Sequence, residues 1–594
     1  MLTELYEYAL SHQLAARPGF KPKRPKGYLL LSQEGAFLGV ELRGKDAPAV
    51  MAPDVGAAAN GTRFCNPLIE KAGIPLNMVN DPVKDKNVPT KHAFFLSALD
   101  SGAEHEPMFA VVAKALRSEE TLETMRAGLA EHKLKPSDPV GFQVDGQPVE
   151  QSERYLDWWA DFRKQFLPAP SGVMPRCLIT GELAPALLTV PKVSGLMAVG
   201  GHTSGDAFLC FDKDAFQSYG LKQSTNAPVS ETAMTAVNAA LTELIRDAKV
   251  LGNAKLVHWY SAPITEEEDL IPVILGDQLA PPAGEEDPAE PGGEADALRA
   301  ARALIQSLND GSRPESLNAR YYIMPLSGAG GRMMVRGWYE GSYETLYDNV
   351  TRWFDDLRLV LWNGKGTTRP PKLKALCIRL LKPGGNPQKV WERMDKELPN
   401  LLNRVLYAII NGTPLPDEAA SRALMWLRSA MLASGRDDDK SSTASSAGET
   451  LVFQLLKAWL RRKQRLKGEE NLMEERFSEQ GRNVAYYCGA LMAVYAAIQS
   501  KAMPEVGVGV VERYYAAASS SPGFVIGKLS QLAQYHLAKL DKGLAVHYEK
   551  RLSELYCRIG TQKIPAMLTL EQQAEFALGY YQQRAALYTS NKEA

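Results

Sequence analysis

The feature of this sequence that most constrains its fold is a change of residue pattern near residue 386. Before that point, short apolar runs alternate with glycine turns and amphipathic helical stretches, whereas helical periodicity then continues almost to residue 588. The main breaks in it are 411–417, the serine-rich 433–449 and 519–523. We therefore predict an α+β protein, in which a mixed α/β N-terminal region with antiparallel strands and hairpins precedes an all-helical C-terminal bundle domain.

Pairs of apolar runs in the first part predict β-hairpins. Residues 28–42 hold two runs about a Gln-Glu-Gly turn, and residues 140–150 hold two about an Asp-Gly turn, which is a stronger signal. A third pair, within 319–340, is joined by the glycine-rich SGAGG. The other elements expected here are strands at 207–211 and 256–260 and a helix that starts near Ser230.

The length of the chain and one acidic segment indicate several domains. A chain of 594 residues exceeds the roughly 250 to 300 residues at which single cores stop growing. Residues 281–296 carry six acidic and no basic residues among prolines and glycines, a composition typical of a solvated loop or linker. We predict an α/β region over 1–280, this acidic linker, a continuation of the α/β region over 297–385, and the helical bundle over 386–594.

Composition argues against a membrane span, a secretory signal and a metal site. The longest nearly apolar run, 485–498, has 14 residues, short of the roughly 20 that cross a bilayer, and predicts a buried helix. The N-terminus has no basic start followed by an apolar stretch, so we expect a cytoplasmic protein. The six cysteines lie at least 33 residues apart and form no CxxC pair, so no metal and no cofactor are expected.

No motif in the sequence predicts catalysis. GGHTSG at 200–205 has the glycine spacing of a phosphate loop, but Asp206 stands where that loop needs a lysine, so a tight turn before a strand is expected. The eight histidines show no pattern of metal ligation or general base chemistry. The paired acids Asp355 and Asp356 are predicted to lie on the solvent face of an amphipathic helix.

Basic residues are clustered although the formal net charge is only −1. In 17–26, three prolines favour an extended arm whose cations could follow phosphates, with plain solubility as the alternative. Residues 363–372 fit a solvated loop and a nucleic-acid backbone contact equally well, and 457–467 is a third basic run. The predicted backbone contacts are Lys21, Lys23, Arg24, Lys26, Lys365, Arg369, Lys372, Arg461, Arg462 and Lys463.

Two loops combine amides with a cation, the residue types that read base edges. The first, 60–67, contributes Asn60, Arg63 and Asn66. The second, within 221–228, contributes Lys222, Gln223 and Asn226. We predict that these six residues contact DNA, so the stretch from Gly200 to Glu231 suits hydrogen bonding better than catalysis.

Several stretches resemble one family in order and spacing. They are 1–9 with its following hairpin, CLITGELAP at 177–185, 200–231 with its Ser-Tyr-Gly and Asn-Ala-Pro-Val-Ser-Glu elements, and 319–357. Together they resemble the large subunit of the type I-C CRISPR effector complex, Cascade, over nearly the whole chain. The chain departs from the family pattern at 66–87 and at 188–195, so contact residues do not transfer there one by one.

The resemblance implies a non-enzymatic subunit of a crRNA-guided complex in antiviral defence. Its implied partners are crRNA, double-stranded target DNA, the backbone, handle-binding and small subunits of Cascade, and a separate helicase-nuclease, with no membrane. It implies recognition of the protospacer-adjacent motif (PAM), help in opening the duplex and R-loop formation, while guide pairing reads the remaining sequence. The alternatives are a structural scaffold without direct DNA contact and an unrecognised nucleic acid processing enzyme.

The resemblance further implies a small subunit made from an internal start in the same reading frame. Lys467 to Glu470, KGEE, can be encoded by purines alone and precedes Met473 by two codons, as a bacterial ribosome-binding site would. The fragment 473–594 would then be a self-contained helical bundle. The alternative is that glutamate-rich helices have purine-rich codons in any case.

Overall fold

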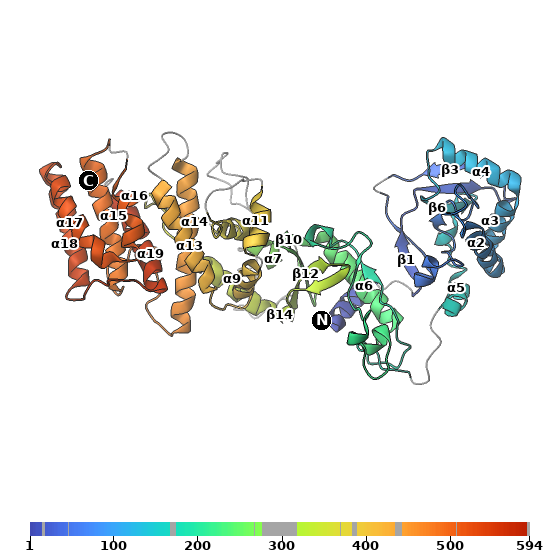
Figure 1. Cartoon of the computed structure of the whole chain (residues 1–594). Coiled ribbons are helices and arrows are strands. Elements are labelled where there is room, and N and C mark those ends of the chain that lie inside the picture. Colours follow the sequence, from blue (N-terminus) through green and yellow to red (C-terminus); the bar gives the residue numbers. More distant parts are fainter. Residues whose placement is uncertain are drawn as a thin grey trace. The chain divides into compact units, whose positions relative to one another are not determined.

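The structure is a computed structural model (Figure 1). It describes residues 1–14, 18–44, 47–166, 174–265, 268–275, 318–368, 370–382, 389–398, 400–433, 442–505 and 508–590. The predicted acidic linker, 281–296, lies outside these residues.

The chain forms two compact units, and each is described by itself. Unit 1 comprises Met1–Gly195, Gly201–Arg246 and Ala329–Met333. Unit 2 comprises Leu196–Gly200, Asp247–Gly328 and Met334–Ala594. The change of residue pattern near 386 is therefore not a boundary of packing, because unit 2 joins strands and helices in one core.

The N-terminal sheet of unit 1 has the strand order β3-β2-β6-β5, with β7 added to β6. It confirms two predicted hairpins: β2 pairs antiparallel with β3, and β6 with β7. Asp145 and Gly146 between β6 and β7 both have positive φ, as the tight hairpin turn requires. β2 also runs parallel to β6. The strands are β2 (Gly27–Leu31), β3 (Phe37–Leu42), β5 (Glu70–Lys71), β6 (Pro139–Val144) and β7 (Gln147–Pro148).

Helices cover this sheet. α3 packs over β2 and β6, and α4 packs against β3, as Figure 1 shows in blue. Ser118 begins α4 because its hydroxyl accepts the Thr121 amide. The core beneath the helices is aromatic and includes Phe95, Phe109 and Trp159. These helices are α2 (Val88–Gly102), α3 (Pro107–Arg117), α4 (Glu119–Glu131) and α5 (Leu156–Phe162); unit 1 also contains α1 (Leu2–Ser11), outside this core.

The rest of unit 1 holds α6 (Glu231–Asp247) and two short strands, β8 (Lys192–Val193) and β9 (Asp206–Ala207). α6 confirms the predicted start, because Ser230 Oγ accepts the Ala233 amide. The strand expected at 207–211 is wrong in extent, since β9 ends at Ala207. Its partner β8 is preceded by Pro191, which has no N–H to continue the ladder.

Unit 2 begins with strands. β11 pairs antiparallel with β10 and with β12, and β14 pairs with β12. The Arg336 amide donates to Pro325 of β12, which closes the predicted hairpin of β12 and β13. The elements are β10 (Lys249–Leu251), β11 (Ala254–Tyr260), α7 (Leu270–Leu275), β12 (Arg320–Ala329), β13 (Arg332–Val335), β14 (Tyr339–Ser342) and α9 (Tyr343–Leu357).

The helical C-terminal region is confirmed. α15 (Val484–Ala502) is buried along most of its length, as its apolar run predicts. It approaches α19 (Leu570–Ser590) closely because Gly489 faces the Phe576 carbonyl and Gly579 faces the Tyr486 carbonyl, where side chains would clash. The other helices are α10 (Leu373–Ile378), α11 (Val390–Glu397), α12 (Leu401–Ile410), α13 (Asp417–Ala433), α14 (Ser442–Leu466), α16 (Val510–Ala518), α17 (Pro522–Leu537) and α18 (Lys542–Ile559). No helix within the described ranges is long and apolar enough to cross a membrane.

Candidate nucleic-acid interface

The first basic segment is a strand rather than a free arm. β1 (Phe20–Lys23) pairs antiparallel with β4 (Val50–Pro53). Lys21 Nζ lies 3.0 Å from Asp54 Oδ1, and its side chain is half exposed. Exposed ion pairs of this kind contribute little stability, so the Lys21 ammonium can turn to a phosphate at small cost.

Lys23 faces inward from the same strand. Its ammonium donates to the carbonyl oxygens of Pro53, at 3.0 Å, and Ile69, at 3.2 Å. Burial lowers the pKa of Lys23 to about 8, although Asp54 and Glu70 favour the charged form. Lys23 therefore ties β1 to β4 and to the segment before β5, and its head group is engaged inside unit 1.

Arg24 and Lys26 complete this segment and both are exposed. Lys26 Nζ lies 2.6 Å from Asp138 Oδ1, and this contact lowers the pKa of the Asp138 carboxyl. Arg24 has no ion pair among the residues that the structure describes. Of the four predicted phosphate contacts in this segment, Arg24 is thus the one that faces solvent with no protein carboxylate to compete with a phosphate, among the described residues.

The loop at 60–66 has one anchored amide and exposed groups before it. Asn66 Oδ1 accepts the Val55 amide at 3.1 Å, and its Nδ2 donates to Glu70 at 3.0 Å, so Asn66 fixes the loop. Asn60 and Arg63 are exposed. The structure thus brings Asn66 together with the β1 lysines around the Asp54–Val55 turn.

Aromatic packing holds Arg63 in place. Its guanidinium lies 5.3 Å from the ring centre of Phe64, within range of a cation–π contact. Phe64 in turn packs edge-on against Phe94 and Phe166, each at 5.1 Å between ring centres. Arg63 is therefore a solvent-facing cation supported by rigid aromatic packing, which reduces the entropy lost on binding a ligand.

The second loop, at 218–226, is built in the same way. Asn226 Oδ1 accepts the Ser218 amide at 2.8 Å, and its Nδ2 donates to the carbonyls of Leu221 and Gln223. Lys222 and Gln223 are exposed. One amide of each loop, Asn66 or Asn226, thus serves as framework, and the neighbouring cation and amide face solvent.

Tyr219 is a residue that the sequence predictions missed. Its side chain is 99 % exposed, although it follows a framework contact at Ser218. Its φ of 52° is in the left-handed region, which a tyrosine rarely adopts without constraint from its surroundings. The available signal was the Ser-Tyr-Gly element itself, because an aromatic residue between turn residues has no core to enter.

The turn at 200–206 confirms that this glycine-rich segment is structural. The His202 amide donates to both carboxylate oxygens of Asp206, at 3.2 and 3.1 Å. Asp206 is fully buried. A buried carboxylate that is already bonded to the backbone would repel a phosphate, so the turn holds β9 in place.

The second basic segment, at 363–372, exposes both of its described lysines, Lys365 and Lys372. The Lys365 amide donates to Asn363 Oδ1 at 2.9 Å, which shapes the turn, while the Lys365 side chain faces solvent. Lys372 is exposed directly before α10. Arg369 lies outside the described residues.

The basic run of α14 has internal partners. Arg461 Nε lies 3.1 Å from Asp356 Oδ1, and Arg462 Nε lies 3.2 Å from Asp356 Oδ2. Arg465 is a third partner of the same carboxylate. Arg462 is 4 % exposed, so its guanidinium is withdrawn from solvent.

Asp356 corrects one expectation. It is fully buried, whereas Asp355 beside it is half exposed, so the prediction of a solvent face holds for Asp355 and is wrong for Asp356. The reason is that three guanidinium groups from α14 neutralise its charge. Lys457 joins the cluster by donating to the Asp356 carbonyl at 3.0 Å, and burial lowers the pKa of Lys457 to about 7.

Lys463 follows Arg462 in the sequence, but it does not contact Asp356 and has other partners. Its Nζ lies 2.8 Å from Asp417 Oδ1 and 3.6 Å from Glu571 Oε1, and it stands over the ring of Trp459. Lys463 therefore links α14 to α13 and α19. The structure gives Arg461, Arg462 and Lys463 internal roles and does not direct them to a common outer surface.

Metal-ligating side chains do not gather at these loops. Among the described residues, no group of three or more His, Cys, Asp or Glu side chains could hold a metal ion. What the loops offer is hydrogen-bond donors, guanidinium and ammonium charge, and one exposed aromatic ring. These are the groups that bind a nucleic acid backbone and base edges.

Comparison with known proteins identifies the family. No curated protein matches the chain. The family model of the CRISPR-associated protein Cas_Csd1 matches residues 2–588, nearly the whole chain. The chain therefore belongs to the Cas_Csd1 family of CRISPR-associated proteins, the large subunit of type I-C Cascade that its sequence resembles.

Proposed function

We propose that this chain is the non-catalytic subunit that recognises the PAM in double-stranded DNA for a crRNA-guided Cascade complex. In this role it helps to open the target and form the R-loop, and it recruits the helicase-nuclease. The observation that carries the proposal is the construction of the two amide loops, together with the family match over residues 2–588. Each loop is fixed internally by one asparagine and presents a cation to solvent.

The proposal separates contact residues from framework residues. Arg63, Lys222 and Gln223 are exposed and contact DNA, and Asn60 lies at the edge of the first loop. A guanidinium is the common reader of guanine in the major groove, and a glutamine amide the common reader of adenine. Asn66 and Asn226 act through the loops that they hold and do not touch the bases.

Tyr219 is assigned to opening of the duplex. An exposed ring on a constrained turn can enter a base step and stack there, as apolar wedges do in proteins that kink DNA. Unstacking costs a few kcal/mol per step, and stacking on an aromatic ring recovers about 1–3 kcal/mol per base. Tyr219 would therefore make the first separated base pair less costly, next to Lys222 and Gln223.

The small subunit is proposed to begin at Met473. In the full chain, Met473 is buried, its amide donates to Gln464 Oε1 at 2.9 Å, and its carbonyl accepts from Arg461. The segment from Met473 contains α15 to α19, which pack on one another. Mass spectrometry of protein expressed from the intact gene should find a fragment that starts there, and Met473→Leu should remove it. Expression without such a fragment would contradict the proposal.

Crosslinking tests the function against its alternatives. Photo-crosslinker placed at Arg63 or Gln223 in the assembled complex should capture duplex that carries the PAM, with a crosslinker at the exposed Glu549 of α18 as control. Permanganate reactivity of thymines beside the PAM should fall in Tyr219→Ala, because fewer base pairs open. Duplex capture at neither position would favour the scaffold. DNA turnover by the purified chain, lost on one substitution, would favour an enzyme.

A further inference from the structure

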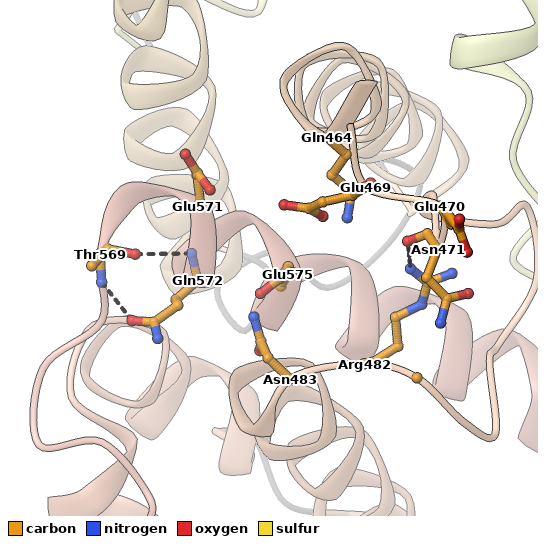
Figure 2. Close-up of a pocket in the computed structure, with 11 residues that line it drawn as sticks. Gln464, Glu469, Glu470, Asn471, Arg482, Asn483, Thr569, Glu571, Gln572 and Glu575 are labelled. Carbon is orange, nitrogen blue, oxygen red and sulfur yellow. Dashed lines mark hydrogen bonds between the residues drawn. The ribbon is translucent and has the colours of Figure 1, made fainter. Parts of the chain in front are cut away.

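A polar pocket of about 660 Å³ opens in the helical part of unit 2 (Figure 2). Three segments line it: the end of α14 with the turn after it, the loop before α15, and the first turns of α19. None of the residues proposed to contact DNA lines this pocket. Its chemistry therefore needs an account separate from nucleic-acid recognition.

The lining of the pocket is acidic. It holds the carboxyl groups of Glu469, Glu470, Glu571 and Glu575 against the single guanidinium of Arg482, and its other lining side chains are amides and a threonine hydroxyl. Glu571 already has partners, because Lys463 and Lys467 reach it from α14 and from the turn that follows. The remaining carboxyl groups leave an excess of negative charge and of hydrogen-bond acceptors.

Glu575 is the lining carboxyl group that the structure leaves without a partner; the buried Nε of Arg482 is likewise unpaired among the described residues. Its side chain is only 9 % exposed, and its Oε2 has no hydrogen-bond partner among the described residues. Figure 2 shows its carboxyl between Asn483, Glu469 and Glu571, directed into the pocket. A buried carboxyl without a partner costs about 1–3 kcal/mol or more, so an occupant that supplies N–H donors and positive charge would be stabilised.

The surroundings of Glu575 set its ionisation. Burial raises the pKa of Glu575 to about 7. Glu469 from the turn after α14 and Glu571 on α19 act in the same direction as burial, whereas Arg482 before α15 and Lys467 after α14 oppose them. Because a bound cation favours the carboxylate, binding near pH 7 releases a proton.

The pocket discriminates among occupants by chemistry. The partial positive charge at the start of α19 would favour an anion, but Glu571 in its first turn and Glu575 one turn later oppose one. The described residues include no group of three metal-ligating side chains, so a coordinated metal ion does not fit. An organic cation with several N–H donors satisfies both carboxyl and amide acceptors.

We propose that this pocket binds an alkylammonium group, as carried by a linear polyamine or by a lysine side chain, with Glu575 as its buried counter-ion. The volume of about 660 Å³ and several separate carboxyl groups suit a molecule with more than one ammonium. The proposal is independent of the role in DNA recognition, since it concerns other residues.

Calorimetric titration of the purified full chain with spermidine, and separately with a trilysine peptide, tests the proposal. At least one probe should bind with saturable, one-site behaviour, and Glu575→Gln should weaken it about tenfold or more. Glu549→Gln, an exposed carboxyl on α18, is the matched control and should change affinity less than about twofold. Tighter binding of spermidine would identify a free polyamine, and tighter binding of trilysine a lysine side chain.

Three further measurements separate loss of binding from loss of folding. Glu575→Gln should keep its circular dichroism and melting temperature, since it removes a charge that has no partner. Glu469→Gln, in the exposed turn, should weaken binding by a smaller factor. Wild-type affinity should rise between pH 6 and pH 8, and that rise should be absent in Glu575→Gln. Equal affinity of wild type and Glu575→Gln, or no saturable binding of either probe, would overturn the proposal.

Discussion

The amide loops of unit 1 and helix α14 of unit 2 both carry basic residues predicted to contact nucleic acid, yet they use positive charge in opposite ways. Each loop fixes one asparagine by internal hydrogen bonds and leaves Arg63 or Lys222 in solvent. α14 buries its cations around Asp356, where Arg462 is almost inaccessible. The comparison teaches that the place of the counter-ion, and not the number of cations, decides whether a basic segment can meet DNA.

Breaking the α14 cluster should have the largest effect. Asp356→Asn removes the carboxylate that three guanidinium groups share, so uncompensated charge remains buried and unfolding should become easier by about 3–5 kcal/mol. Urea unfolding measures this change in the free energy of unfolding. Asp355→Asn is the matched control on the neighbouring, half-exposed carboxyl, and should cost less than about 1 kcal/mol. Equal effects of both substitutions would contradict the internal role of α14.

A pH profile should show that Lys23 belongs to the framework. Its folded pKa of about 8 lies below the ordinary value of 10.5, so between these values the unfolded chain binds more protons and stability rises with pH. Lys23 should contribute roughly 3 kcal/mol of the rise across this window. Lys23→Met should lose that share and keep the share of Lys457, whose pKa is also lowered. Urea unfolding at pH 7.5 and 10 measures the difference. A rise as large in Lys23→Met as in the wild type would show that Lys23 is not a titrating framework group.

Exposed loop residues should change DNA binding without changing stability. Arg63→Ala or Gln223→Ala should weaken binding of PAM-bearing duplex by about 1–3 kcal/mol, roughly tenfold, and should alter PAM preference. Asn66→Ala should lower both the melting temperature and DNA affinity, because the Val55 and Glu70 bonds hold the loop. Melting curves and fluorescence anisotropy of the assembled complex separate these outcomes. A fall in stability for Arg63→Ala would contradict the distinction between exposed contact residues and framework residues.

The smallest effect should come from Lys365. Its side chain faces solvent from a turn fixed by Asn363. Lys365→Ala should weaken binding to all duplexes alike and lower the slope of log affinity against log salt by about 1. Titrations at several salt concentrations measure that slope. An unchanged slope would show that this turn does not reach a phosphate.

The sequence alone was sufficient for local structure. The Asp145-Gly146 hairpin, the start of α6 after Ser230 and the buried helix α15 each depend on residues close in the chain, and all three are confirmed. Turn chemistry, capping and apolar periodicity are local properties, which explains this success.

Features that depend on residues distant in the chain could not be predicted from the sequence. Asp356 and Arg462 are 106 positions apart in sequence, and no periodicity in the sequence predicts their contact. Asn66 has the composition of a base reader but bonds to Val55 and Glu70. Only the fold shows how fully the Tyr219 side chain is exposed, and that Glu575 of the largely buried helix α19 lacks a partner for its Oε2.

The most direct test replaces Arg63, Lys222 and Gln223 together by alanine in the assembled complex. Affinities are then measured for two duplexes of equal length that differ only in the PAM. We expect the variant to bind both duplexes with the same weak affinity while its melting temperature stays that of the wild type. Retained preference for the PAM-bearing duplex would contradict the account, because recognition would then reside outside the two loops.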